Sequence, residues 1–280
     1  YKNVTLLTFV FIIGEAVIET LIPFITANLV NKVKDGTNMS EVGYTGLVLI
    51  LMAVLSLACG GLAGFTCAKA SAGFAKNLRS DIFAKTQSFD FENIDKFSSS
   101  SLVTRMTTDV ANVQMSFMMI IRTAIRAPLM LIFSVVMAYI MGGALATTFV
   151  IIIPILGLGL IFIGRKAMPA FQSVFRKYDR LNESIEENVR AMRVVKGFSR
   201  EDYEKSKLGR AAEEIRGDFT RAERIVALNT PLMQICVYFN MIFVLLIGSR
   251  MVITYHGQTV DVGQLSAMLT YGFQVLMSLM

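Results

Sequence analysis

Long stretches without a charged residue constrain the fold of this chain more than any other feature. They cover residues 42–68, 127–164, 225–249 and 262–280, and a fifth stretch, 3–31, is interrupted only by two glutamates. A bilayer core about 30 Å thick is crossed by about 20 apolar helical residues, so each stretch is long enough to span a membrane. The longest of them contains Gly142-Gly143 near its middle, which predicts two spans joined by a tight turn.

The sequence therefore predicts an all-α membrane protein with six transmembrane helices. The spans are expected at about 6–30, 44–68, 119–141, 144–164, 227–249 and 262–280. Charged residues make up 17% of the chain and hydrophobic residues 54%, whereas soluble domains carry roughly 25% charged residues. This composition excludes a soluble enzyme, a secreted disulfide scaffold and a disordered chain. The three cysteines fall inside predicted spans, which favours packing roles over disulfides or a metal site.

The distribution of positive charge predicts the orientation. Of the 27 Lys and Arg residues, 23 lie in segments 69–126 and 165–224. Because Lys and Arg are retained on the cytoplasmic side, both long connections and both ends of the chain are expected there. The net charge of +6 is then a consequence of topology, and no nucleic acid partner is expected.

The two cytoplasmic hairpins, 69–118 and 165–226, are expected to be extensions of the membrane helices. The helical pattern continues without a breaker from Val42 to about Ser88, which is roughly 70 Å of helix. In the second hairpin the apolar residues recur at helical spacing, as Leu181, Ile185, Val189, Met192 and Val195. Apolar stripes outside the bilayer need partners, so these helices are predicted to pack together and to reach something far from the lipid.

Each hairpin is expected to end in a distinct tip. The first tip mixes aromatic and acidic residues over 89–97 and is followed by four serines. In the second, Gly197 is expected to end a helix, and the segment 199–202 has capping-box spacing before a short helix that ends near Lys205 to Lys207. A short helix lying across each tip and a simple solvated turn are both compatible with this composition.

Two segments resemble the permeases of ATP-binding-cassette (ABC) exporters. Residues 100–110, Ser-Ser-Leu-Val-Thr-Arg-Met-Thr-Thr-Asp-Val, resemble the segment after the first cytoplasmic tip of that family. Residues 190–201, Arg-Ala-Met-Arg-Val-Val-Lys-Gly-Phe-Ser-Arg-Glu, are similar to the stretch leading into the second tip. Glu19 with Pro23 in the first span, and the entry to the sixth span at Gly263, also fit. The resemblance covers the whole chain in order.

The resemblance implies an ABC exporter type transmembrane domain, 1–280, that pairs with a second permease half as a homodimer or heterodimer. Its two tips would be coupling helices docked on nucleotide-binding domains. The residues implied at the first tip are Phe91, Asn93, Ile94, Asp95, Lys96 and Phe97, and those at the second are Phe198, Ser199, Arg200, Glu201, Asp202, Tyr203 and Glu204. The implied substrate is a hydrophobic or amphipathic drug, lipid or peptide, and the implied location is a bacterial plasma membrane.

The sequence departs from the full family pattern because it has no phosphate-binding loop. No Gly is followed by Lys, so G-x-x-x-x-G-K-[ST] is absent, and an LSGGQ-type signature is absent as well. No catalytic residue, metal site or cofactor is therefore predicted in this chain. Hydrolysis of ATP with Mg²⁺ is expected of a nucleotide-binding domain after residue 280, where the chain stops inside an apolar segment.

Charged and large residues within the spans are the candidates for a substrate cavity. They are Glu15, Glu19, Met118, Arg122, Arg126, Phe239, Met241, Phe273 and Met277. Glu15 and Glu19 are four residues apart and share a helix face, where a charge costs about 2.5–3.5 kcal/mol. They are expected either to line the cavity or to pair with neighbouring helices. Arg122 and Arg126 either line its inner mouth or extend toward lipid phosphates.

Two other function classes remain open at this level. A proton-coupled secondary transporter would use Glu15 and Glu19 as a proton relay, but it predicts inverted repeats that the sequence lacks. A membrane scaffold or receptor would need a sizeable outer region, and the outer connections are short. The sequence features favour an ABC exporter permease over both alternatives.

Overall fold

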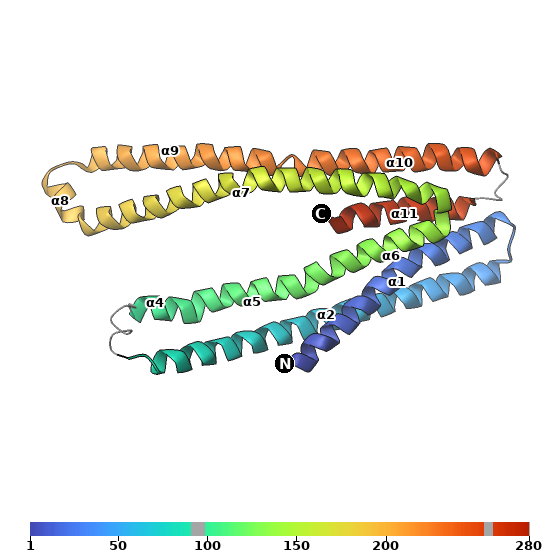
Figure 1. Cartoon of the computed structure of the whole chain (residues 1–280), viewed down its shortest axis with the longest axis horizontal. Coiled ribbons are helices and arrows are strands. Elements are labelled where there is room, and N and C mark those ends of the chain that lie inside the picture. The colour runs from blue at the N-terminus through green and yellow to red at the C-terminus, as the bar shows by residue number, and fades with distance from the viewer. Residues whose placement is uncertain (91–98, 255–259, 280) are drawn as a thin grey trace. The chain divides into compact units, whose positions relative to one another are not determined.

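Helices make up every element of secondary structure in the parts of the chain that the computed structural model describes, residues 1–90, 99–254 and 260–279 (Figure 1). The elements are α1 (Lys2–Lys34), α2 (Met39–Gln87), α4 (Ser99–Thr104), η1 (Arg105–Asp109), α5 (Val110–Met119), η2 (Ile120–Ala124), α6 (Ile125–Gly142), η3 (Gly143–Ala146), α7 (Thr147–Arg190), α8 (Met192–Gly197), α9 (Glu201–Val226), α10 (Asn229–Thr254) and α11 (Val262–Leu279). The predicted all-α fold class is confirmed.

The helices are long enough for the predicted membrane spans. Among the described residues, five helical runs are long and apolar enough to cross a membrane: Lys2–Lys34, Met39–Gln87, Ser101–Gly142, Thr147–Arg190 and Glu201–Thr254. The sixth expected span coincides with α11, an apolar helix of 18 residues. Helix α2 extends over 49 residues, about 70 Å, as the unbroken helical pattern of the sequence predicted.

A tight turn at Gly142-Gly143 separates the third and fourth helical runs, as predicted. Helix α6 ends at Gly142, and Gly143 has a φ of +48°, a conformation that glycine adopts without steric cost. A single 3₁₀ turn, η3, then leads into α7 at Thr147.

The chain divides into two compact units. The first unit comprises residues 1–150 and 240–280, and α1 packs within it against α2, α6 and α11. The buried positions of α1 recur every three or four residues, which places them on one face: Thr8, Ile12, Ala16, Thr20, Pro23 and Ala27. Most of the buried positions of α2 are also small residues. Small residues let helix backbones approach closely, which is how helices pack inside a membrane.

The second unit, residues 151–239, is a long antiparallel hairpin of α7 and α9 that continues into the beginning of α10 (Figure 1). Two contacts set its register. A Cβ atom at Gly159 would touch the side chain of Leu232, and the rings of Phe171 and Phe219 meet edge to face with centroids 6.0 Å apart. Four members of the predicted apolar stripe, Ile185, Val189, Met192 and Val195, line a small cavity together with Leu208 of α9. The stripe is divided between two helices, because α7 ends at Arg190 and Met192 and Val195 lie on α8.

The expected geometry of the second tip is only partly right. Helix α8 does end at Gly197, but the helix after Ser199 does not stop near Lys205 to Lys207, because α9 continues to Val226. No proline interrupts this run, and ion pairs three residues apart support it. The predicted capping box is wrong as well, since Arg200 is the N-cap and no side chain caps the helix.

Candidate functional site

The two glutamates of α1 share one arginine of α6. The Arg126 Nη2 atom donates to both carboxylate oxygens of Glu19, at 2.9 and 2.8 Å, and lies 3.4 Å from Oε1 of Glu15. The side chain of Glu15 is only 12% exposed and sits against Gly60 of α2, where a Cβ atom would come within 2.9 Å of its carboxylate. Pairing offsets the cost of charges within an apolar helix, so this cluster holds α1 against α6.

A local change in helix geometry precedes Arg126. Pro128 lacks the N–H that would bond the carbonyl of Ala124, and its ring would clash with that carbonyl in a regular α-helix. The chain forms the π-helical turn η2 over Ile120–Ala124, immediately before the helix that contains this proline. Such turns are frequent at functional sites because they re-aim the side chains around them.

Beside the ion cluster, α6 and α11 form a groove of about 480 Å³. Its lining consists of Arg122, Thr123, Arg126, Ala127, Met130, Phe273, Gln274, Met277 and Ser278. A hydrogen bond between Ser134 and Gln274, 3.1 Å long, links the same two helices. Two guanidinium groups and an apolar wall therefore share one open groove, of a volume usual for small-molecule sites.

The structure brings some of the predicted cavity residues together and leaves others apart. Arg122, Arg126, Phe273 and Met277 line the groove, whereas Glu15 and Glu19 do not line it and contact it only through Arg126. Met118 is half-buried, and its carbonyl faces Cys67 of α2. Phe239 and Met241 are exposed on α10 and are not part of the groove lining.

Helix α11 is held on α1 by contacts that the sequence did not predict. The Gly263 N–H donates to the Asn31 side chain at 2.8 Å, and a Cβ atom at Gly263 would collide with the carbonyl oxygen of Ala27. Further along, the buried Tyr271 hydroxyl donates to the carbonyl of Thr20 at 2.8 Å, close to Pro23. Polar residues within predicted spans, such as Asn31 and Gln274, were the available signal, but their partners could not be read from spacing.

Tyr271→Phe should therefore weaken the packing of α11 on α1. It removes one buried hydrogen bond between the two helices, so we expect a loss of about 1 kcal/mol in unfolding free energy. Unfolding in mixed micelles measures this effect. The exposed Tyr139→Phe is the matched control and should leave stability unchanged; equal losses in the two variants would contradict the assigned role.

Of the two predicted tips, only the second has its predicted residues among those that the structure describes. The predicted residues Phe91, Asn93, Ile94, Asp95, Lys96 and Phe97 lie outside the described residues. In the second tip, Phe198 is 77% exposed between α8 and α9, and the neighbouring Ser199 has a φ of +50°. Tyr203 and Asp202 are exposed as well, whereas Glu204 turns inward and accepts a hydrogen bond from Asn188 of α7.

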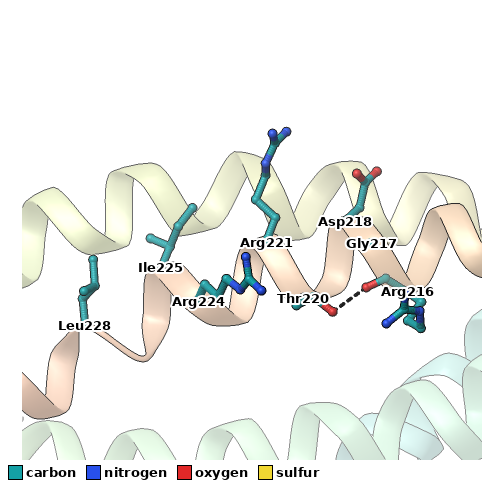
Figure 2. Close-up of a pocket in the computed structure, with 8 residues that line it drawn as sticks. All are labelled: Arg216, Gly217, Asp218, Thr220, Arg221, Arg224, Ile225 and Leu228. Carbon is teal, nitrogen blue, oxygen red and sulfur yellow. Dashed lines mark hydrogen bonds between the residues drawn. The ribbon is translucent and has the colours of Figure 1, made fainter.

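An open surface on α9 is lined by residues that follow one another along the helix. Figure 2 shows Arg216, Thr220 and Arg224 along one side of the helix and Arg221 on the other. A hydrogen bond from Arg216 to Glu213 lowers the pKa of that carboxyl group. This surface is shallow and lies on one strip of helix, so it does not enclose a small molecule.

The described residues hold no cluster of metal-ligating side chains and no disulfide. Across residues 1–90, 99–254 and 260–279, no group of three or more His, Cys, Asp or Glu side chains could hold a metal ion. The three cysteines are free thiols.

Comparison with known families agrees with this arrangement of helices. The family model described as "ABC transporter transmembrane region" matches residues 5–279. The chain belongs to this family. It is thus an all-α transmembrane domain of an ABC transporter and a multi-pass membrane protein.

Curated members of the ABC transporter family are longer than this chain. It is 28% identical over 275 residues to the ABC transporter ATP-binding protein YfiB of Bacillus subtilis, covering 98% of this chain and 48% of YfiB. It is 25% identical over 259 residues to the ABC transporter ATP-binding protein MT1311 of Mycobacterium tuberculosis, covering 92% of this chain and 44% of that relative. The chain thus spans about half the length of the relatives it matches.

Proposed function

We propose that this chain is the permease half of an ATP-driven exporter. It pairs with a second half, identical or different, and moves hydrophobic or amphipathic molecules such as drugs, lipids or peptides across the plasma membrane. Nucleotide-binding domains, which hold ATP and Mg²⁺, dock on its two tips in the cytoplasm. The relatives are named as ATP-binding proteins, and this chain covers about half of their length. Both observations support the presence of such domains in the whole protein.

The second tip is the observation that carries this proposal. Helix α7 continues for 26 residues past Gly164, the end of its uncharged stretch, which is about 39 Å of helix. At the end of this extension Phe198 exposes most of its ring. A large exposed aromatic side chain is the kind of residue that anchors a protein interface, and an arm this stiff transmits movement over its whole length.

The groove supports an amphipathic substrate. Its wall is formed by Met130, Phe273 and Met277, and methionine adapts to ligands of different shape. Arg122 and Arg126 provide polar contacts at the same place. A permease cavity of this kind would be completed by the second half.

Truncation of the second tip tests the coupling. In the whole protein reconstituted in lipid vesicles, Phe198→Ala with Asp202→Ala should reduce ATP-dependent substrate transport by about tenfold. Loss of a central aromatic anchor costs about 2 kcal/mol, which is more than a factor of ten in docking equilibrium. Transport and ATP hydrolysis are measured on the same vesicles, and hydrolysis should lose its stimulation by substrate.

The matched control is Phe175→Ala with Asp179→Ala, which removes the same two residue types from exposed positions on the stem of α7. This variant should transport like the wild type. Wild-type coupling in the tip variant, or an equal loss in the stem variant, would overturn the role of the tip.

The alternative, a proton-coupled secondary transporter, is less well supported. Its proposed relay, Glu15 and Glu19, is bound to Arg126, an arrangement that serves helix packing. The two proposals differ in their energy source. Transport that is driven by a proton gradient and unaffected by removal of ATP would favour the alternative.

A further inference from the structure

Four basic residues lie at one level of the second unit. Gly159 faces Leu232 and Phe171 faces Phe219, so positions 165 and 166 of α7 lie opposite positions 224–226. Arg165 and Lys166 are therefore level with Arg224, and Arg221 lies one turn of α9 away. All four side chains are exposed. We call Arg165, Lys166, Arg221 and Arg224 the basic belt.

The basic belt marks the end of the apolar surface on both helices. The uncharged stretch 127–164 ends immediately before Arg165, and the stretch 225–249 begins immediately after Arg224. Two stretches distant in sequence thus end at the same level of the folded hairpin. Because long basic side chains at the end of an apolar span reach into the headgroup layer, this level corresponds to one surface of the bilayer.

In the described structure the cations of the basic belt have no acidic partner, whereas several cations nearer the tip do. Further along the hairpin, Lys177 contacts Asp218 at 2.7 Å and Glu214 at 3.7 Å, and Arg216 is paired with Glu213. Within the described parts of the chain, none of the four belt residues forms an ion pair, and the ring of Phe162 lies 4.9 Å from Lys166 Nζ. Part of the positive charge of the stem is thus neutralised within the hairpin, whereas the charge of the belt is not.

The local charge balance favours an anion. Helix α7 carries no Asp or Glu before Asp179, and Glu223 is the one acidic residue among the belt positions of α9. Figure 2 shows that Arg221 and Arg224 project from different sides of α9, so these two cations do not converge on a single point. Such an arrangement suits several separate phosphate groups in a plane better than one soluble ligand.

We propose that the basic belt binds the phosphate headgroups of anionic phospholipids in the adjoining leaflet. Phosphate oxygens accept charge-assisted hydrogen bonds from guanidinium and ammonium groups while the acyl chains lie against the apolar surface beyond the belt. Each basic residue near an anionic surface strengthens binding by about fivefold. The belt thereby fixes the depth and tilt of the α7–α10 hairpin in the membrane, independently of ATP hydrolysis.

Lipid binding to the purified whole protein in a zwitterionic detergent tests this proposal. Native mass spectrometry counts bound phosphatidylglycerol and phosphatidylcholine during titration with each lipid. We expect at least about a tenfold preference of the wild type for phosphatidylglycerol, and a decrease of this preference with salt. The fourfold variant R165Q/K166Q/R221Q/R224Q should lose the preference, and Arg221→Gln and Arg224→Gln alone should each weaken it about fivefold.

The control variant R176Q/R180Q/R193Q/R210Q removes the same charge from exposed positions of α7, α8 and α9 outside the belt, and it should keep the preference. A variant with lysine at the three belt arginines should keep it as well. Equal loss in the belt and control variants, or an unchanged preference in either single variant, would overturn the proposal. Displacement of the lipid by equimolar glycerol 3-phosphate would overturn it too, because the belt would then be a site for soluble anions.

Discussion

Replacing Arg126 with leucine should destabilise the transmembrane domain by about 2–4 kcal/mol. The substitution leaves Glu15 and Glu19 without their common partner inside the bundle, and removal of one member of a buried ion pair costs about 3–5 kcal/mol. We expect a smaller loss of stability than for a fully buried ion pair, because the Arg126 side chain is 37% exposed and the two carboxylates keep some freedom to find other partners. Unfolding by a denaturing detergent in mixed micelles measures the loss.

Two variants make this prediction specific. Arg122→Leu removes an arginine from the same groove and the same run of helix, but from a position without a glutamate contact in the described structure, and should cost less than about 1 kcal/mol. The triple variant E15Q/E19Q/R126L removes all three charges and should recover most of the lost stability. A triple variant no more stable than Arg126→Leu would show that the ion cluster is not the source of the effect.

The second large effect is expected at Gly263. A valine there cannot fit, because even its Cβ atom would collide with the carbonyl oxygen of Ala27, which is backbone and has little freedom to move. Helix α11 would have to separate from α1, with loss of the hydrogen bond to Asn31 and of the packing around Tyr271. We expect a destabilisation of about 3 kcal/mol or more, measured by thermal unfolding of the purified protein.

Gly157→Val is the matched control, since it makes the same change in an apolar helix where nothing lies within 4 Å of the added Cβ atom. It should leave the unfolding temperature nearly unchanged. If Gly263→Val unfolds at the wild-type temperature, α11 does not depend on close contact with α1.

Much of the helical layout could be predicted from the sequence because its determinants are local. The absence of charge over 20 or more residues specifies a membrane helix, and the Gly142-Gly143 pair specifies the turn between two of them. The long extensions followed from helical patterns without a breaker. Helix α2 has the expected length, whereas α7 ends at Arg190 and a separate helix, α8, completes the run to Gly197. The second tip was harder, because the capping pattern at Ser199 is not used: Arg200 is the N-cap of α9, and no side chain caps the helix.

The candidate groove was predicted only in part. The choice rested on two criteria: charged residues are unusual in a membrane span, and large side chains can form the wall of a cavity. Four of the residues chosen in this way do line one groove: Arg122, Arg126, Phe273 and Met277. The same criteria also selected Met118, Phe239 and Met241, which are not part of its lining. Composition identifies which side chains are notable, but it does not say which of them face the groove once the helices have packed.

The sequence by itself determined the membrane environment of this protein, its all-α fold and its family, because hydrophobicity and the order of motifs can be read without knowing any tertiary contact. Tertiary structure alone decided that Glu15 and Glu19 pair with Arg126, that Tyr271 bonds to α1, and that Arg165 and Arg224 are level with each other. Each of these contacts joins residues tens to hundreds of positions apart. Their geometry depends on how small residues such as Gly263 let neighbouring helices approach, and the spacing of residues along one helix carries no record of that.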